Sequence, residues 1–226
     1  MATRRQQPPR IFLLSPANCS GVRAQMVGSP AARFDLAQQL RMPEGAPLGE
    51  LFAFVSGLYF RGKLAYARRF ARPPEPGDPV VGDGVLVITP GAGLRAADTP
   101  VTIDSFRAFA SVAIDLGNPK YVQPLASSAR AVDEAAGPDC EAVLLGSVAS
   151  GKYVELLLPI FGDRLLFPPD FVGRGDMSRG GLMLRCVHAD LELPYVPLRG
   201  AVRHGARPPK LEPLKPHLKM RSTGKR

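Results

Sequence analysis

C-E-A-V-L-L-G-S-V-A-S-G-K-Y-V-E-L-L-L-P-I, the residues from Cys140 to Ile160, contain a strand pattern, a turn and a helix pattern in close succession. Glu141 to Leu145 is a mostly apolar run long enough for one buried strand, and Tyr153 to Leu158 has helical apolar spacing that Pro159 is expected to end. A turn of small residues lies between them. Such a turn leaves backbone N–H groups unpaired at the positive end of the helix dipole, so it predicts an anion site.

The residues that would bind the anion are small or basic: Gly146, Ser147, Ser150, Gly151 and Lys152. The letters also fit G-x-x-x-x-G-K, but Tyr153 stands where the phosphate-binding loop of nucleotide triphosphatases has the Ser or Thr that ligates Mg²⁺. No other strand candidate ends in the Asp of the second metal-holding motif. An atypical NTP-binding loop and a tight turn with an exposed lysine therefore remain alternatives to generic phosphate binding.

Length and composition indicate one ordinary globular domain. The chain has 226 residues, 45% hydrophobic and 22% charged. No apolar run approaches the roughly 20 residues of a membrane span, and no secretory signal precedes the first strand pattern, so the cytoplasm is the expected location and no membrane partner is expected. Three cysteines and three histidines form no zinc pattern. The expectation is reduced thiols, no metal and no cofactor.

The net charge of +9 is concentrated at the two ends. Residues 1–10 carry +3 and residues 199–226 carry +8, which leaves −2 for residues 11–198. We therefore expect a disordered N-terminal arm (1–10), a single α/β domain (11–198) and a basic, disordered C-terminal tail (199–226). Such a tail is typical of a polyelectrolyte arm that binds nucleic acid non-specifically, although it also suits a purely solubilising role.

Strand and helix patterns alternate along residues 11–198, which predicts a mostly parallel sheet of about four or five strands with helices on both faces. The expected strands are Ile11 to Leu14, Val85 to Thr89, Glu141 to Leu145, Arg164 to Phe167 and an edge strand in Leu193 to Leu198. The expected helices are Ala31 to Arg41, Leu58 to Ala71, Ile103 to Val112 with Thr102 as its cap, and Tyr121 to Ala136.

The expected helix from Leu58 to Ala71 is the most basic part of residues 11–198. Its basic residues, and one that follows it, are Arg61, Lys63, Arg68, Arg69 and Arg72. We expect these side chains to form a solvated face, with contact to a phosphate backbone as the alternative.

Ligands of parallel sheets bind outside the carboxyl ends of the strands, so the loops after the strands are the expected rim of a site. The expected rim residues are Asn18, Cys19, Ser20, Gly91, Gly93 and Asp170. Arg174 and Arg179, in a loop rich in Gly, Arg and Asp, are expected to hold phosphate.

Several segments resemble the YaaA-type proteins of peroxide stress and their uncharacterised bacterial relatives. The matching segments are Leu14-Ser15-Pro16-Ala17, then Gly57-Leu58-Tyr59 with Arg61, Lys63, Tyr66 and Ala67, then Thr89 to Asp98, and Gly151-Lys152-Tyr153-Val154. They cover about half the chain. The resemblance implies DNA binding in oxidative stress, or a relation to domains that accompany enzymes exchanging bases in transfer RNA. A clear helix–hairpin–helix segment, present in YaaA, is missing from this sequence.

The histidines all lie at or beyond His188, which disfavours a Ser/His/Asp or Cys/His nucleophile. A reaction at a nucleoside glycosidic bond needs only a carboxylate, anion-binding backbone and an aromatic ring for the base. Asp176 or Asp170 and Tyr153 or Tyr59 fill these roles, and we select Asp176 and Tyr153 as the catalytic residues. The sequence therefore favours a nucleotide- or nucleic-acid-handling protein, with a non-enzymatic nucleic-acid-binding protein as the alternative.

Overall fold

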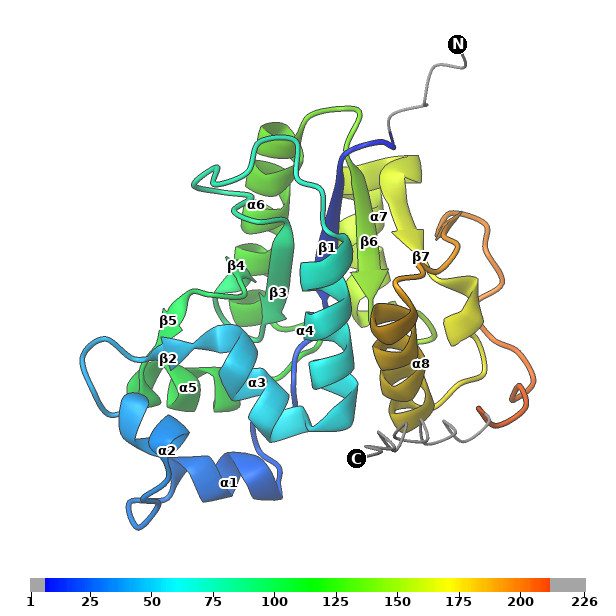
Figure 1. Ribbon diagram of the computed structural model, residues 1–226. Coiled ribbons are helices and arrows are strands. Elements are labelled where there is room, and N and C mark those ends of the chain that lie inside the picture. The colour runs from blue at the N-terminus through cyan, green and yellow to red at the C-terminus, as the bar shows by residue number, and fades with distance from the viewer. Residues whose placement is uncertain (1–6, 212–226) are drawn as a thin grey trace, which may run out of the picture.

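The computed structural model describes residues 7–211 of the chain. Within them six strands form one sheet in the order β4-β3-β1-β6-β7-β8 (Figure 1). The inner strands run parallel, and β4 and β8 are antiparallel edges. The bounds are β1 (Arg10–Leu14), β3 (Val85–Thr89), β4 (Gly93–Ala96), β6 (Glu141–Leu145), β7 (Leu165–Phe167) and β8 (Val196–Pro197).

The expected α/β class and mostly parallel sheet are confirmed, with six strands instead of four or five. The additional strand is β4, which turns back on β3 through a tight loop, so a hairpin follows the second long strand. The edge strand at the end of the chain is present, although only Val196 and Pro197 of the expected Leu193 to Leu198 pair with β7. Pro194 and Pro197 lack the N–H that a longer ladder needs.

Helices cover both faces of the sheet. On one face lie α4 (Leu58–Phe70) and α8 (Asp176–Ala189), and on the other lie α6 (Pro119–Ala136) and α7 (Gly151–Phe161) (Figure 1). Strand side chains alternate between two cores accordingly: Phe12 and Leu14 belong to the first, Ile11 and Leu13 to the second. This alternation in β1, with every one of these residues fully buried, is that of a strand covered on both sides.

A group of shorter elements lies at one end of the sheet (Figure 1). It contains α1 (Val22–Gly28), α2 (Asp35–Gln39), α3 (Leu48–Ser56) and α5 (Ile103–Ala110), with the small antiparallel pair β2 (Ala46–Pro47) and β5 (Pro100–Val101). The expected helix from Ala31 to Arg41 shrinks to α2. Thr102 caps α5 as expected, since its hydroxyl oxygen accepts a hydrogen bond from the N–H of Ser105.

The expected end of α7 at Pro159 is wrong, because the helix continues to Phe161. A proline this close to a helix end removes one backbone hydrogen bond, and the burial of Phe161 in the core offsets that cost. Asp176 is the first residue of α8, so the helix begins inside the stretch that was expected to be a loop rich in Gly, Arg and Asp.

Helices α4 and α8 touch backbone to backbone. A Cβ on Gly62 would lie 2.7 Å from the carbonyl oxygen of Gly180, and a Cβ on Gly180 would lie 2.7 Å from the carbonyl oxygen of Leu58. Any larger residue at either position would force the helices apart. The glycine pair therefore sets how closely the first turn of α8 approaches Tyr59.

The two ends of the described chain are held by specific contacts. Arg10, expected in a disordered arm, is the first residue of β1 and forms ion pairs with Glu141 and Glu192. Residues 201–211 form no helix or strand, yet this segment contacts the Val172–Gly181 region through Gly205, Ala206 and Leu211. The expected disorder of residues 1–6 and 212–226 concerns parts of the chain outside the described residues. Within residues 7–211, every helix is too short or too polar to cross a membrane.

Candidate functional site

Lys63 is the side chain whose environment differs most from the expectation. The sequence predicts it on a solvated basic face, but it is fully buried. Its Nζ donates hydrogen bonds to the carbonyl oxygen of Ser15 at 2.5 Å and to the Ser15 Oγ at 2.9 Å. The rings of Tyr59 and Phe60 lie 4.5 and 4.6 Å from Nζ. Lys63 therefore joins α4 to the carboxyl end of β1, where parallel-sheet ligands bind.

Lys63 lacks an ion pair with a carboxylate among the residues that the structure describes. The pKa of its ammonium is lowered to about 7, mainly by burial. The negative charge of Asp176 opposes this shift, and the positive charge of Arg179 adds to it. An amine in this environment titrates near neutral pH, which is the condition for a side chain that transfers protons.

Four more side chains gather around the same edge from three helices. Asp176 and Arg179 stand on the first turn of α8, 3.6 Å apart between Oδ1 and Nη1. Burial raises the pKa of Tyr59 to about 12, and the nearby guanidinium of Arg179 partly opposes this shift. Burial and then the charge of Asp176 raise the pKa of Tyr153, on α7, to about 12. The predicted pair Asp176 and Tyr153 thus lies within mutual electrostatic reach.

The hydroxyl of Tyr59 is a buried polar group that makes no hydrogen bond in the described residues. An unpaired buried hydroxyl costs on the order of 1–3 kcal/mol, so a bound ligand atom that accepts its proton would relieve that cost. Arg179 is also buried, and its Nε donates to the carbonyl oxygen of Phe171 at 3.1 Å. The guanidinium is thereby fixed beside Asp176 and has less freedom to hold a phosphate than expected.

The predicted anion loop lies directly beside Ser15. A Cβ on Gly146 would lie 2.8 Å from the Ser15 Cβ, so a residue without a side chain is needed there. Ser147 and Ser150 are partly exposed, and Ser150 precedes α7 without a side-chain cap bond. Lys152 is exposed at the start of α7, which fits both an anion-binding lysine and the alternative of a tight turn with an exposed lysine. The loop and the Lys63 group therefore share one edge of the sheet.

Two other predicted residues have structural partners. Arg174 donates from Nε to the carbonyl oxygen of Asp170 at 2.9 Å and from Nη1 to the Ser178 hydroxyl at 3.3 Å and the Pro209 carbonyl oxygen at 3.4 Å. This guanidinium stabilises the turn before α8 and holds the C-terminal segment against it. Asp170 itself is exposed.

The loop after β1 is built by its own hydrogen bonds. The Asn18 Oδ1 accepts from the N–H of Ser20 at 3.1 Å and from its hydroxyl at 2.9 Å, and both residues are exposed. Cys19 is buried, and burial raises the pKa of its thiol to about 12. A thiol protonated at neutral pH is a poor nucleophile, so Cys19 acts in this fold as a small core residue.

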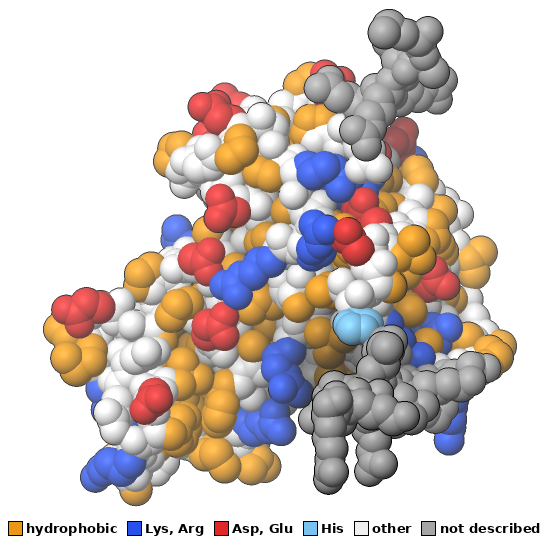
Figure 2. Space-filling model, in the orientation of Figure 1, with side chains coloured by type: hydrophobic (Ala, Val, Ile, Leu, Met, Phe, Trp, Pro, Cys, Tyr) orange, Lys and Arg blue, Asp and Glu red, His pale blue; other side chains and the backbone are white. Residues whose placement is uncertain are grey.

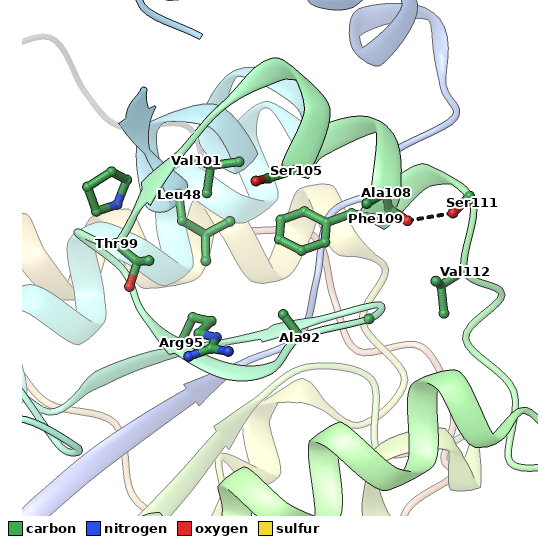
Figure 3. Close-up of a pocket in the computed structure, with 12 residues that line it drawn as sticks. Leu48, Ala92, Arg95, Thr99, Val101, Ser105, Ala108, Phe109, Ser111 and Val112 are labelled. Carbon is green, nitrogen blue, oxygen red and sulfur yellow. Dashed lines mark hydrogen bonds between the residues drawn. The ribbon is translucent and has the colours of Figure 1, made fainter. Parts of the chain in front are cut away.

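The rim residues after β3 face elsewhere. Gly93 packs against α6, where a Cβ would lie 2.3 Å from the Pro124 carbonyl oxygen. Gly91 lines a cavity of about 420 Å³ between the β3–β4 hairpin and α5, into which Leu48, Val101 and Phe109 point (Figure 3). Arg95 contributes the charge of that cavity. The cavity is therefore mainly apolar and distinct from the polar edge at Ser15.

Sequence reasoning missed Ser15 and Lys63 as site residues. Tyr59, Lys63, Tyr66 and Phe70 recur at helical spacing and are all buried, so Lys63 occupies a core position in an otherwise aromatic stripe. A lysine at a core position of such a stripe is the feature of the sequence that could have identified Lys63 as a buried residue. The described residues contain no group of three or more His, Cys, Asp or Glu side chains placed to hold a metal ion.

Comparisons with known proteins add no assignment. No family model matches the chain, and neither a curated protein nor a solved structure matches it significantly. On the face shown in Figure 2, basic and acidic side chains lie next to one another over much of the surface. Arg68, for instance, forms ion pairs with Glu50 and Asp98. The function is therefore inferred from the side chains at the carboxyl edge of the sheet, near Ser15.

Proposed function

We propose that the chain is a nucleotide- or nucleic-acid-handling protein that acts at a nucleoside glycosidic bond. The supporting observation is that Asp176 and Arg179 of α8 lie within electrostatic reach of Tyr59 of α4 and Tyr153 of α7. A carboxylate near an aromatic ring is the minimal equipment for this reaction, because positive charge develops on the sugar as the base leaves.

Each part of the site has a role in this proposal. The Asp176 carboxylate stabilises the oxocarbenium-like centre, and Arg179 holds that carboxylate in place from one helical turn away. The ring of Tyr153 lies against the base. The backbone N–H groups at the start of α7 and the exposed Lys152 bind a phosphate, which takes the place of the Glu155 carboxylate beside Gly151. The resemblance to YaaA-type proteins points in the same direction.

The test is release of free base from a panel of nucleosides, nucleotides and short oligonucleotides, followed by chromatography. Asp176→Asn keeps the shape of the side chain and removes its charge, so we expect the rate to fall by about 10²-fold or more. Asp139→Asn, an exposed residue just before β6, is the matched control and should keep the wild-type rate. Absence of base release from every substrate, or an unchanged rate in Asp176→Asn, would refute the proposal.

A non-enzymatic nucleic-acid-binding protein is the second candidate. It is favoured by the C-terminal segment, where Arg203, Arg207 and Lys210 are exposed while the segment contacts the region before and within α8. These cations have no ion pair among the described residues. They would bind a phosphate backbone that passes the Asp176 edge.

A further inference from the structure

The reaction proposed at Asp176 makes no use of the Ser15–Lys63 contact, which has the geometry of a nucleophile and its base. The Ser15 Oγ and the Lys63 Nζ are 2.9 Å apart, within hydrogen-bond distance. The second bond of Nζ, to the Ser15 carbonyl oxygen, fixes the amine over the same residue. Ser15 follows the last residue of β1, at the edge where loops diverge and ligands approach.

The serine and the lysine differ in how deeply they are buried. Ser15 keeps 5% of its surface exposed and Lys63 has none, so the serine is the member of the pair nearer to solvent. The amine is enclosed by Tyr59 and Phe60 of its own helix and by Ser15, just after β1, and the charges that reach it come from Asp176 and Arg179 of α8. A desolvated amine without a paired carboxylate favours its neutral form, which accepts a proton.

We propose that Ser15 is a nucleophile activated by Lys63 as general base, and that it attacks the carbonyl carbon of an ester or amide. Serine–lysine pairs of this kind replace the Ser–His–Asp arrangement on several unrelated folds. No histidine is needed, in agreement with a sequence whose histidines all lie at or beyond His188.

The step is balanced within the pair. As the Oγ–C bond forms, the hydroxyl proton passes to the neutral Nζ of Lys63. The ammonium then returns that proton to the leaving alcohol or amine as the C–O or C–N bond breaks. Water hydrolyses the acyl-serine by the same route, with Lys63 again taking the proton. The hydroxyl of Tyr59, one helical turn before Lys63, makes no hydrogen bond in the described residues and is therefore available to a bound ligand.

A fluorophosphonate probe tests this pair without knowledge of the substrate. The serine oxygen attacks phosphorus, the P–F bond breaks, fluoride leaves and the proton goes to the base. We expect mass spectrometry of the intact wild-type chain and its peptides to find one adduct, on Ser15. Lys63→Met should slow labelling by about 10²-fold or more, and Ser15→Ala should abolish it. Ser127→Ala and Lys120→Met, both exposed on α6, are matched controls that should label like the wild type.

The pH profile gives a second readout. Because the neutral amine is the active form, the wild-type labelling rate should rise between pH 6 and 8. A wild-type chain without an adduct on Ser15, or a folded Lys63→Met that labels at the wild-type rate, overturns the proposal. If Lys63→Met does not fold, a rate that stays constant from pH 6 to 8 in the wild type overturns it instead. Base release and adduct formation are separate readouts, so either function can fail alone.

Discussion

Lys63 shows what a single charged residue does inside an apolar helix face. It stands between Tyr59 and Tyr66 in a stripe that packs on the sheet, and its Nζ donates to two oxygens of Ser15. Retaining a charge there is costly because no water solvates it. The protein therefore binds a proton at this position less tightly than the unfolded chain does.

The pH dependence of stability follows from that difference. The pKa of Lys63 is about 7 in the fold against about 10.4 in an unfolded chain, so between these values the unfolded state binds the extra proton. Stability from this group must then rise with pH above 7, by at most about 1.4 kcal/mol per pH unit, and below pH 7 the fold bears the full cost of the buried charge.

We expect Lys63→Met to remove this dependence. The free energy of unfolding, measured with urea at pH 6, 7, 8 and 8.5, should favour the variant most at pH 6, and its advantage should shrink as the pH rises. Removal of the hydrogen bonds to Ser15 changes the offset between the two curves but not their difference in slope. Lys120→Met should follow the wild-type curve. Parallel curves for wild type and Lys63→Met would show that Lys63 titrates normally.

Helices and strands were predictable where the pattern was local. Val85 to Thr89 and Glu141 to Leu145 are strands with the expected bounds, because unbroken apolar runs of this length suit only a covered strand. The helix α8 was not predictable over its first half. Asp176 to Gly181 contains two glycines after Gly175 and has the composition of a loop, and the contact with α4 explains only the first of them, Gly180. Information of this kind lies in tertiary packing, which one sequence does not display.

The candidate site could be predicted only where its residues follow the ends of strands. Asp176, Tyr153 and the Gly146 to Lys152 loop follow from the rule that loops meet at the carboxyl edge of a parallel sheet. Lys63 comes from a helix that crosses to that edge, so no rule based on strand ends could select it, and Tyr59 of the same helix was named only as an alternative to Tyr153. Gly93 was selected by the same rule, but β4 continues the hairpin at that position and turns it toward α6.

The contact of α4 with α8 gives a prediction with a built-in control. Gly180→Ala places a methyl group 2.7 Å from the Leu58 carbonyl oxygen, and we expect the free energy of unfolding to fall by about 1–3 kcal/mol. Gly181→Ala, the next residue on the same helix, meets only the Leu211 side chain at 3.6 Å. That variant should be neutral or slightly stabilising because alanine favours helix. Equal urea midpoints for the two variants would contradict this close packing of the helices.

At the scale of the whole molecule, charged side chains join distant parts of the chain. Arg10, at the start of β1, contacts Glu192 beyond α8, and Arg72 contacts the same carboxylate. The Tyr195 hydroxyl donates to Glu192 at 3.0 Å and lies 2.6 Å from the Tyr66 hydroxyl. These contacts hold the segment after α8 against the sheet, so the C-terminal segment starts from a fixed point.

Because the C-terminal segment is held in place, its exposed basic side chains can be tested as a nucleic-acid interface. We expect the combined variant Arg203→Ala, Arg207→Ala and Lys210→Ala to flatten the dependence of log affinity on log salt, by about 0.9 for each phosphate that the variant no longer neutralises. Binding of a short oligonucleotide is measured by fluorescence anisotropy between roughly 50 and 200 mM salt, concentrations at which such slopes are resolved. Arg107→Ala, Lys120→Ala and Arg130→Ala together form the control. An unchanged slope in the first variant would place the phosphate-binding surface elsewhere.

The place of β1 in the sheet has a consequence during synthesis. It is a central strand, yet its partner β6 lies 131 residues further along the chain, as the pairing of Arg10 with Glu141 shows. At translation rates of roughly 5–20 residues per second, a mostly apolar strand waits on the order of 10 s for the neighbour that covers its second edge. The nascent chain therefore carries an apolar strand with an unpaired edge until β6 has been synthesised, and such an edge can pair with other chains.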